Sequence, residues 1–406
     1  MTTGPQSLVC LTTSAATGGA ETSLLTLLAA FGRLEPSWAI TVIAPSSGPL
    51  LDRCRQLGIA GMTLPYPAAL SSLGESGATG VRRRSVNQMT LLGHSARAAV
   101  TLPRYVTALR RALLDVKATV VHSNGLKGHI TGALAKPGGT RLVWHLHEYV
   151  RGRPLTARLL RALAGRADAL VTNSDSVLDD ASAAVGRSAH LRRIYNAVDL
   201  SAFSPDGPRL DLAALAGLGP DDGLVRVGLV ATFGRWKGHD VFIDAIARLR
   251  ECAGLRAYVI GDAVYSTAGS QWSQAELRGR VAARGLDDLI GFTGLVSDVP
   301  AALRSLDILV HASTQPEPFG MVIAEGMASA RAVVAVRAGG AAELFDDRVN
   351  AVGCAPGNAS ELADRIRELV LDPALRATLG INARRAASER FSSDRMAEEF
   401  REVYRG

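Results

Sequence analysis

The sequence of 406 residues has few cysteines and no long apolar run, and each shortage excludes a class of protein. Its four cysteines, Cys10, Cys54, Cys252 and Cys354, lie far apart and form no CxxC pair. This spacing fits neither a zinc site nor a disulfide framework, so a reducing cytoplasm is the expected compartment. No stretch reaches the roughly 18 apolar residues that a membrane-spanning helix needs.

The composition and the start of the chain are typical of an ordinary globular protein. Hydrophobic residues make up 47% and charged residues 20% of the chain, whose length suffices for two domains. The apolar segment Ser7–Thr12 has no basic residue before it and no cleavage-site pattern. We therefore interpret it as a first strand rather than as a secretory signal.

Lysine is scarce, and the positive charge is unevenly distributed. The sequence holds 4 Lys against 41 Arg, and residues 1–200 carry a formal charge of +11 whereas residues 201–406 carry −4. A basic first half favours anionic partners, such as phosphates, an anionic acceptor or a membrane surface. A genome-wide preference for arginine would explain the excess equally well.

Apolar segments typical of strands alternate with helical patterns along the chain. This alternation indicates parallel sheets covered by helices on both faces, so the sequence predicts an α/β protein with doubly wound sheets. The expected helices include Glu21–Phe31, Val241–Arg250 and Leu362–Leu371. The expected strands are Ser7–Thr12, Ala39–Ala44, Thr119–Ser123, Leu142–His145, Ala169–Asn173, Val225–Ala231, Ala257–Gly261, Ile290–Thr293, Ile308–Ala312 and Ala332–Val336.

The strand series ends near Tyr195 and restarts at Val225, which indicates two domains. A stretch rich in Gly, Pro and Asp separates the two series, so we place the hinge near residue 197, between domains 1–197 and 198–389. Doubly wound sheets bind ligands at the carboxyl ends of their strands. Two such domains facing each other are expected to hold a ligand in a cleft.

Two glycines follow the first expected strand. Gly18 and Gly19 precede an apolar helical pattern, and the amides at such a helix start favour an anion. The spacing is not GxGxxG, which argues against a nicotinamide cofactor. Taken alone, the pair indicates a plain tight turn just as well.

Two cations follow the first strand of the second series. Arg235 and Lys237 lie in a loop between an expected strand and an expected helix, where they are placed to neutralise a diphosphate leaving group. An exposed basic turn is the simpler interpretation. The scarcity of lysine elsewhere in the chain favours a functional one.

Two carboxylates follow the expected strand Ile308–Ala312. Glu317 lies in a loop shaped by Pro318 and Gly320, and Glu325 lies one turn into the helix that follows, so both side chains can enter one site. Carboxylates accept hydrogen bonds from sugar and ribose hydroxyls. The amides at this helix start can bind phosphate oxygens.

The segment Trp144–Tyr149 contains His-x-His-Glu at the end of another strand. The pattern suggests a metal site, but no third ligand has a recognisable spacing, so we expect no metal. His147 lies beyond the strand, toward the expected cleft, and is the candidate for a hydrogen bond on the acceptor side. A packed, unreactive histidine is the alternative.

Together these motifs resemble the family 4 glycosyltransferases, which are retaining enzymes of the GT-B fold with two Rossmann-like domains. Glu317–Ala328 is similar to the family's E-x7-E signature, while Gly18–Glu21 and Lys237-Gly238 match its glycine and lysine loops. The resemblance covers nearly the whole chain in order. Its other matches are Asn173-Ser174, Asn196–Asp199, Gly261-Asp262, Phe292–Gly294 and Gly339–Glu343.

The resemblance implies a role for each matching residue, with a nucleotide diphosphate sugar as partner and no metal or other cofactor. Lys237 and Arg235 would hold the diphosphate, Glu317 the transferred sugar and Glu325 the ribose hydroxyls. A last helix at about 390–406 should cross back onto the first domain. The remaining donor contacts would be Gly18, Gly19, Val296, Phe319, Gly320, Met321 and Val322, and the acceptor-side contacts Asn124 and His147.

Two positions depart from the family pattern. The family usually has an arginine five residues before the loop lysine, where this chain has Thr232, and Arg235 is the candidate replacement. Some members have a second histidine where this chain has Asn124. Asparagine can hydrogen-bond a sugar hydroxyl but cannot act as a cation or a base.

The function implied is transfer of a hexose-type sugar from a UDP- or GDP-linked donor to an acceptor hydroxyl, with retention, in polysaccharide or glycoconjugate assembly. A natural-product-tailoring transferase, a sugar-nucleotide epimerase or hydrolase, and a non-catalytic sugar-nucleotide binder remain open. A dehydrogenase is disfavoured because both candidate loops lack GxGxxG.

The acceptor is undetermined, and no nucleic-acid partner is expected. Residues 65–90 are rich in Pro, Gly and Ser and predict a mobile loop, which is either plain solvated surface or a contact for an acceptor or a membrane. Arg82–Arg84, with Arg104, Arg110 and Arg111, suggest a lipid-linked or otherwise anionic acceptor. Peripheral docking at the inner face of the membrane is a hypothesis.

Overall fold

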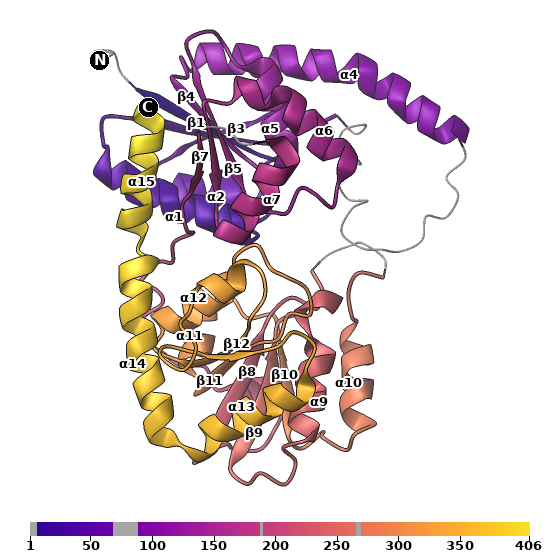
Figure 1. The fold of residues 1–406 in the computed structure, drawn as a ribbon, viewed down its shortest axis with the longest axis vertical. Helices are drawn as coiled ribbons and strands as arrows, with labels where there is room; N and C mark the ends of the chain where they lie inside the picture. Colours follow the sequence, from indigo (N-terminus) through magenta and orange to yellow (C-terminus); the bar gives the residue numbers. More distant parts are fainter. Residues whose placement is uncertain (1–5, 68–87, 187–189, 265–268) are drawn as a thin grey trace. The chain divides into compact units, whose positions relative to one another are not determined.

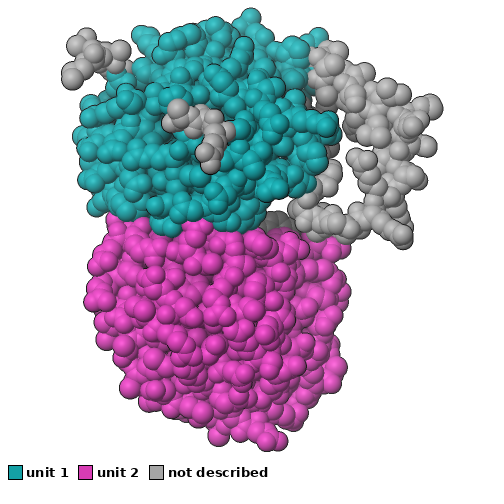
Figure 2. All heavy atoms as spheres, viewed as in Figure 1, with its two compact units in different colours: residues 1–197, 393–406 teal, residues 198–392 magenta. Residues whose placement is uncertain are grey.

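The computed structural model describes residues 6–67, 88–186, 190–264 and 269–406, with only the backbone described over 88–100. These residues form two compact units (Figure 2). Unit 1 comprises residues 1–197 and 393–406, and unit 2 comprises residues 198–392. Arg82–Arg84 lie outside the described residues. In the described part of the chain, no helix has the length and apolar character to cross a bilayer.

Unit 1 is built on a parallel sheet of seven described strands in the order β3-β2-β1-β4-β5-β6-β7. The interior strand β1 is buried along its whole length, which is why its sequence is apolar almost without interruption. The strands are β1 (Ser7–Thr12), β2 (Ala39–Ala44), β3 (Ala60–Thr63), β4 (Val120–Asn124), β5 (Arg141–Leu146), β6 (Ala169–Thr172) and β7 (Leu191–Arg193).

Helices cover the sheet of unit 1, and the last of them comes from the end of the chain (Figure 1). Helix α15 packs along α1, where the rings of Tyr404 and Phe31 meet edge to face at 5.2 Å. The helices are α1 (Gly19–Leu34), α2 (Pro49–Gln56), α4 (Gln88–Asp115), α5 (Leu126–Ala135), α6 (Pro154–Leu163), α7 (Asp175–Val185) and α15 (Ser393–Arg405), with the short 3-10 helix η2 (Ala164–Arg166).

Unit 2 repeats this plan with six described parallel strands in the order β10-β9-β8-β11-β12-β13. Its strands are β8 (Val225–Val230), β9 (Leu255–Ile260), β10 (Ile290–Gly294), β11 (Ile308–His311), β12 (Ala332–Val336) and β13 (Val352–Cys354). Its helices are α8 (Leu212–Ala216), α9 (His239–Ala247), α10 (Gln274–Ala282), α11 (Val299–Arg304), α12 (Met321–Ala328), α13 (Ala359–Leu371) and α14 (Pro373–Arg390), with 3-10 helices η3 (Arg235–Lys237) and η4 (Gly340–Glu343).

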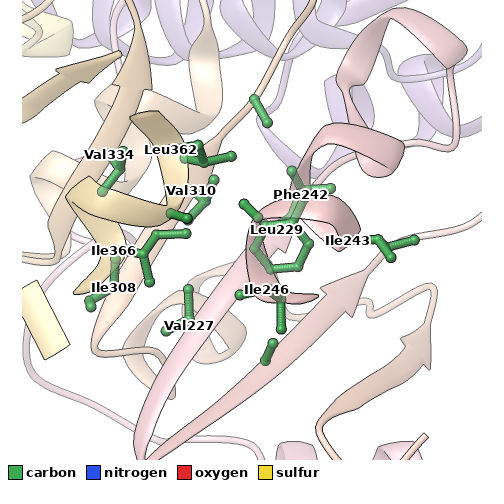
Figure 3. Packing of buried hydrophobic residues seen from close by; sticks show 14 of the residues in the cluster. Val227, Leu229, Phe242, Ile243, Ile246, Ile308, Val310, Val334, Leu362 and Ile366 are labelled. Carbon is green, nitrogen blue, oxygen red and sulfur yellow. The ribbon is translucent and has the colours of Figure 1, made fainter. Parts of the chain in front are cut away.

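The core of unit 2 lies between its sheet and the helices α9 and α13 (Figure 3). Phe242 and Ile246 of α9 pack near Leu229 of β8, while Leu362 and Ile366 of α13 pack near β11 and β12. All of these side chains are at most 1% exposed. The periodic apolar face of each helix therefore matches the apolar strands beneath it.

The expected α/β class with two doubly wound parallel sheets is confirmed, and the expected strands lie within two residues of the observed ones. The short strands β3, β7 and β13 were not expected. Neither was α4, whose first residues fall within the loop expected over 65–90; residues 68–87 of that loop lie outside the described part. The helix expected at about 390–406 begins at Ser393 and packs on unit 1.

Both sheets reverse their strand order beside their first strand, which opens a crevice at the carboxyl ends of β1 and β4 and of β8 and β11. In unit 2, Gly238 brings the two loops at this crevice together. Its φ is +75°, and a Cβ there would lie 1.9 Å from the carbonyl oxygen of Ala312, just after β11. The Thr314 amide donates to the Trp236 carbonyl at 2.7 Å.

We predict that Gly238→Ala destabilises the protein more than Gly254→Ala. Both glycines have positive φ, which costs alanine about 1–2 kcal/mol, but Gly254 has nothing within 4 Å of its missing Cβ. The collision at Gly238 should add about 1–3 kcal/mol, measured from the midpoint of urea unfolding. Equal midpoints for the two variants would show that the loops do not need this close approach.

Candidate active site

Lys237 and Glu317 meet at the crevice of unit 2. Lys237 ends η3 after β8, and Glu317 follows β11, so the order reversal between these two strands places them side by side. The Lys237 Nζ lies 2.6 Å from the Glu317 Oε1. The Glu317 backbone is fixed by a bridge to Gly339, after β12, and its carbonyl accepts from the Gly340 amide at 2.8 Å.

Two residues that the motif does not include complete the surroundings of Glu317. The His311 Nε2 lies 3.2 Å from the Glu317 Oε1, and the Ser313 hydroxyl donates to the same oxygen. Burial raises the pKa of Glu317, but Lys237 and His311 lower it more, so the pKa lies well below its ordinary value. Glu317 is therefore a buried carboxylate that stays ionised and orients the Lys237 ammonium.

The start of α12 offers amide donors beside this pair. Gly320 precedes the helix with a φ of +100°, and no side chain caps the helix start. The amides of Met321 and Val322, the first two of the helix, have no acceptor inside it, and the helix dipole favours an anion there. Phe319 is buried and packs edge to face on Phe391, which anchors the loop.

Glu325 lies in the second turn of α12 and differs from Glu317 in its surroundings. It is partly buried, and in the described structure its carboxylate has no hydrogen bond or ion pair. Burial raises its pKa to about 7. The two acids of the motif thus differ: Glu317 is ionised and paired, whereas Glu325 titrates near pH 7.

Two other expected donor contacts lie away from the Lys237–Glu317 pair. The Arg235 guanidinium stacks over Trp272 at 3.7 Å and forms an ion pair with Glu276 at 3.1 Å. The Thr232 hydroxyl is buried with no hydrogen-bond partner in the described structure. Val296 is partly buried in the loop after β10, two strands from β8, or roughly 10 Å at ordinary strand spacing.

The crevice of unit 1 joins the other expected residues. Gly18 and Gly19 are exposed at the start of α1, where the Gly18 amide donates to Glu21. Asn124 ends β4 beside β1, and its Nδ2 donates to the Ala20 carbonyl at 3.3 Å. His147 Nε2 donates to the Asn124 Oδ1 at 2.6 Å, so the two acceptor-side candidates form one hydrogen-bonded unit.

His147 stays neutral near neutral pH because burial lowers its pKa to about 3. Its Nε2 carries the proton given to Asn124, which leaves Nδ1 as the unprotonated nitrogen. His147 therefore presents a neutral ring that is fixed in orientation. Across the described chain, no three His, Cys, Asp or Glu side chains gather in a way that could hold a metal ion.

Two further histidines extend inward from His147: His145, the first histidine of the His-x-His-Glu pattern, and His122, for which no role was expected. The rings of His145 and His147 lie 3.9 Å apart, and those of His122 and His145 lie 5.2 Å apart. His122 Nδ1 shares a hydrogen bond of 2.6 Å with the Tyr404 hydroxyl of α15. Both nitrogens of His145 are buried with no hydrogen-bond partner in the described structure. The sequence feature that could have pointed to these two residues is a histidine inside each of the apolar strands β4 and β5.

Comparisons with known proteins show the family of the chain. A family model described as "Glycosyl transferases group 1" matches residues 216–386, and one described as "Glycosyltransferase Family 4" matches residues 17–202. Each model covers one of the two units that carry the described crevices. The chain belongs to the group 1 glycosyltransferases of family 4.

The individual relatives match part of the chain in sequence. A lipopolysaccharide core biosynthesis mannosyltransferase, LpcC of Rhizobium leguminosarum bv. viciae, is 33% identical over 52% of this chain and 58% of its own length. A D-inositol 3-phosphate glycosyltransferase of Saccharomonospora viridis is 30% identical over 60% and 56%. These matches thus span somewhat over half the length of each relative.

A solved structure, Alr3699/HepE of Anabaena in complex with UDP-glucose, resembles this chain with a TM-score of 0.79. It is 26% identical and covers 98% of each chain. The two-sheet plan is therefore shared with a protein that binds a nucleotide sugar.

We predict that His145→Phe leaves stability unchanged or raises it at pH 7, whereas His122→Phe lowers it by about 1–3 kcal/mol. Phenylalanine fills a similar volume, and at His145 it removes two buried nitrogens without partners. At His122 it strips the Tyr404 hydroxyl of its hydrogen bond. Urea unfolding of the two variants measures the difference. An equal loss of stability in both would contradict the assignment of a hydrogen-bond partner to His122 alone.

We also predict that His145→Phe changes how the stability of the protein depends on pH under acidic conditions. Burial, with smaller contributions from His147, His122 and His129, lowers the pKa of His145 well below 6.5, so the folded state binds fewer protons than the unfolded chain. Stability therefore falls as the pH drops below about 6.5, by at most about 1.4 kcal/mol per pH unit for each such histidine. The His145→Phe variant should therefore lose less unfolding free energy per pH unit than the unsubstituted protein, and the difference is the contribution of one histidine.

Proposed function

We propose that this chain is a retaining glycosyltransferase that moves a hexose-type sugar from a UDP- or GDP-sugar to an acceptor hydroxyl. The observation that carries the proposal is the Lys237–Glu317 pair, held at 2.6 Å beside the start of α12. A cation and free helix amides at one crevice suit a diphosphate that gains negative charge as it leaves. The UDP-glucose bound to the Anabaena structure supports a nucleotide diphosphate donor.

In the proposed reaction, the bond between the sugar's anomeric carbon and the β-phosphate oxygen breaks, and the acceptor oxygen bonds to that carbon on the same face. The acceptor proton passes to the departing phosphate, so no protein nucleophile or metal is required. Lys237 and the amides of Met321 and Val322 stabilise the charge that develops on the diphosphate. Gly19 supplies a further amide at the start of α1, and the Gly18 amide does so by leaving Glu21.

The remaining site residues bind and orient. Glu317 fixes the Lys237 ammonium and offers a carboxylate to the transferred sugar, while Asn124 and His147 offer hydrogen bonds to the acceptor side. Arg235 is a secondary contact, since it reaches the diphosphate only by leaving Glu276 and Trp272. Val296 is assigned to the base of the nucleotide.

The setting that we propose is assembly of a polysaccharide or glycoconjugate in the cytoplasm, and the lipopolysaccharide-core relative supports it. The acceptor is lipid-linked or otherwise anionic. The exposed Arg104 and Arg111 of α4, two helical turns apart, favour docking on an anionic membrane surface.

We predict that Lys237→Ala lowers the transfer rate by about 10²–10³-fold with the fold intact, because a charged contact to the leaving group is lost. Arg235→Ala, which removes a neighbouring cation from a position that faces Glu276, should lower it much less. Rates are measured by product formation from a nucleotide sugar and an acceptor, and folding by circular dichroism. Full activity of the folded Lys237→Ala variant would refute the proposal.

The same assay without acceptor separates the other functions on this scaffold. Consumption of the donor with no acceptor present would indicate an epimerase or a hydrolase. Tight binding of a nucleotide sugar with no turnover for any acceptor would indicate a binding protein.

We predict that nucleoside diphosphate binding weakens by up to about tenfold per pH unit as the pH falls below 7. Glu325 must be ionised to accept two ribose hydroxyls, and burial raises its pKa to about 7. Calorimetric titration with UDP between pH 8 and pH 6 measures the effect. Glu325→Gln should bind weakly and lose this dependence, while the titration of the phosphate itself is common to both proteins. An identical pH dependence of UDP affinity in Glu325→Gln would contradict the assignment of Glu325 to the ribose hydroxyls.

A further inference from the structure

Unit 1 contains a polar pocket where its strands begin, at the end of the sheet opposite the Asn124–His147 unit. The pocket has a volume of about 600 Å³ and opens at the amino ends of β5 and β6. Strand β5 runs from Arg141 at this pocket to Leu146 at the other edge, and an extended strand of this length spans roughly 20 Å. A ligand in the pocket therefore lies beyond the reach of Asn124 and His147.

The walls of this pocket are strongly basic. Its charged lining residues are Arg110, Lys136, Arg141 and Arg166 against a single acid, Asp168, which gives a formal charge of +3. Asp168 is already engaged, because it accepts from Lys136 Nζ at 2.5 Å and from the Leu142 amide at 2.7 Å. None of the three arginines forms an ion pair with a carboxylate in the described structure, although Arg141 also interacts electrostatically with Asp168.

The three guanidinium groups are held in place by the backbone. Each uses one nitrogen to donate to a carbonyl and keeps its other donors available. The contacts are Arg110 Nη1 to the Lys136 carbonyl at 2.8 Å, Arg141 Nε to the Val403 carbonyl at 2.6 Å and Arg166 Nη1 to the Ala133 carbonyl at 3.0 Å. Because these side chains are already ordered, binding an anion costs them little conformational entropy.

Backbone amides add to the basic groups. Gly138 and Gly139 form an exposed turn between α5 and β5, and a Cβ at either would have nothing within 4 Å. In the described structure their amides have no hydrogen-bond acceptor. Gly139 has a φ of +78°, the left-handed geometry found in backbone nests that bind anions.

We propose that this pocket is a binding site for a phosphate-bearing ligand, separate from the site of sugar transfer. Guanidinium groups pair two donors with two phosphate oxygens, and a net charge of +3 suits a group with several negative charges, such as a diphosphate. The volume lies in the usual range for small-molecule sites, so the pocket has room for more than the phosphate group itself. A soluble phosphorylated compound and a lipid headgroup share this chemistry.

Lysine NMR tests the proposal, because the chain has only four lysines and one of them lines the pocket. With lysine labelled by ¹³C at Cε, titration with pyrophosphate should shift the Lys136 signal. Lys237 reports independently on the donor site in the same spectra, so failure of one assignment leaves the other measurable. A Lys136 signal that responds neither to pyrophosphate nor to vesicles that contain phosphatidic acid would overturn the proposal.

Paired variants show whether the arginines create the site. Arg110→Ala with Arg166→Ala should weaken the pyrophosphate affinity seen at Lys136 at least about tenfold and leave the Lys237 response unchanged. Arg53→Ala with Arg55→Ala removes the same charge from the exposed face of α2 and should change neither response. An equal loss of pyrophosphate affinity in both double variants would show that only the net charge of the protein matters, and this would overturn the proposal.

A second titration distinguishes the two sources of phosphate. Vesicles of phosphatidylcholine with phosphatidic acid present the group on a membrane, and vesicles of phosphatidylcholine alone are the control. A Lys136 response to pyrophosphate supports a soluble ligand, and a response only to the phosphatidic acid vesicles supports a lipid headgroup. Either response counts as binding in this pocket only if it weakens in the double variant Arg110→Ala with Arg166→Ala.

Discussion

The contact between Lys237 and Glu317 is the interaction on which the candidate site of unit 2 depends. A carboxylate as buried as Glu317 is costly unless it is paired, and Lys237, His311 and Ser313 all approach its Oε1. Buried ion pairs contribute little to stability compared with apolar packing. The position of the pair at the reversal of the strand order fits the role that we propose for it, in which Lys237 contacts a diphosphate.

The same topological constraint operates in both units. Each sheet places its first and fourth strands side by side, so the loops that follow them leave in opposite directions and open a crevice. In unit 2 this crevice joins Lys237 to Glu317, and in unit 1 it joins the start of α1 to Asn124 and His147. The basic pocket of unit 1 lies at the other edge of its sheet, where the strands begin.

The sequence was sufficient to predict the central strands and the motif residues, because continuous apolar runs and loop chemistry are local signals. Strands β3, β7 and β13 are short, and α4 contains Pro103, so their patterns are weak. The direction of Arg235 was missed because Trp272 and Glu276 come from a later segment of the chain. The contact of His311 with Glu317 likewise depends on how β11 and its loop fold, which spacing alone does not reveal.

The most direct test of this account is a crystal structure of the protein with UDP. We expect an oxygen of the β-phosphate within hydrogen-bond distance, about 3 Å, of the Lys237 Nζ, and the ribose hydroxyls against Glu325. Glu317 should keep its contact with His311. A nucleotide bound away from both Lys237 and Glu325, with the Lys237–Glu317 pair undisturbed, would contradict the account.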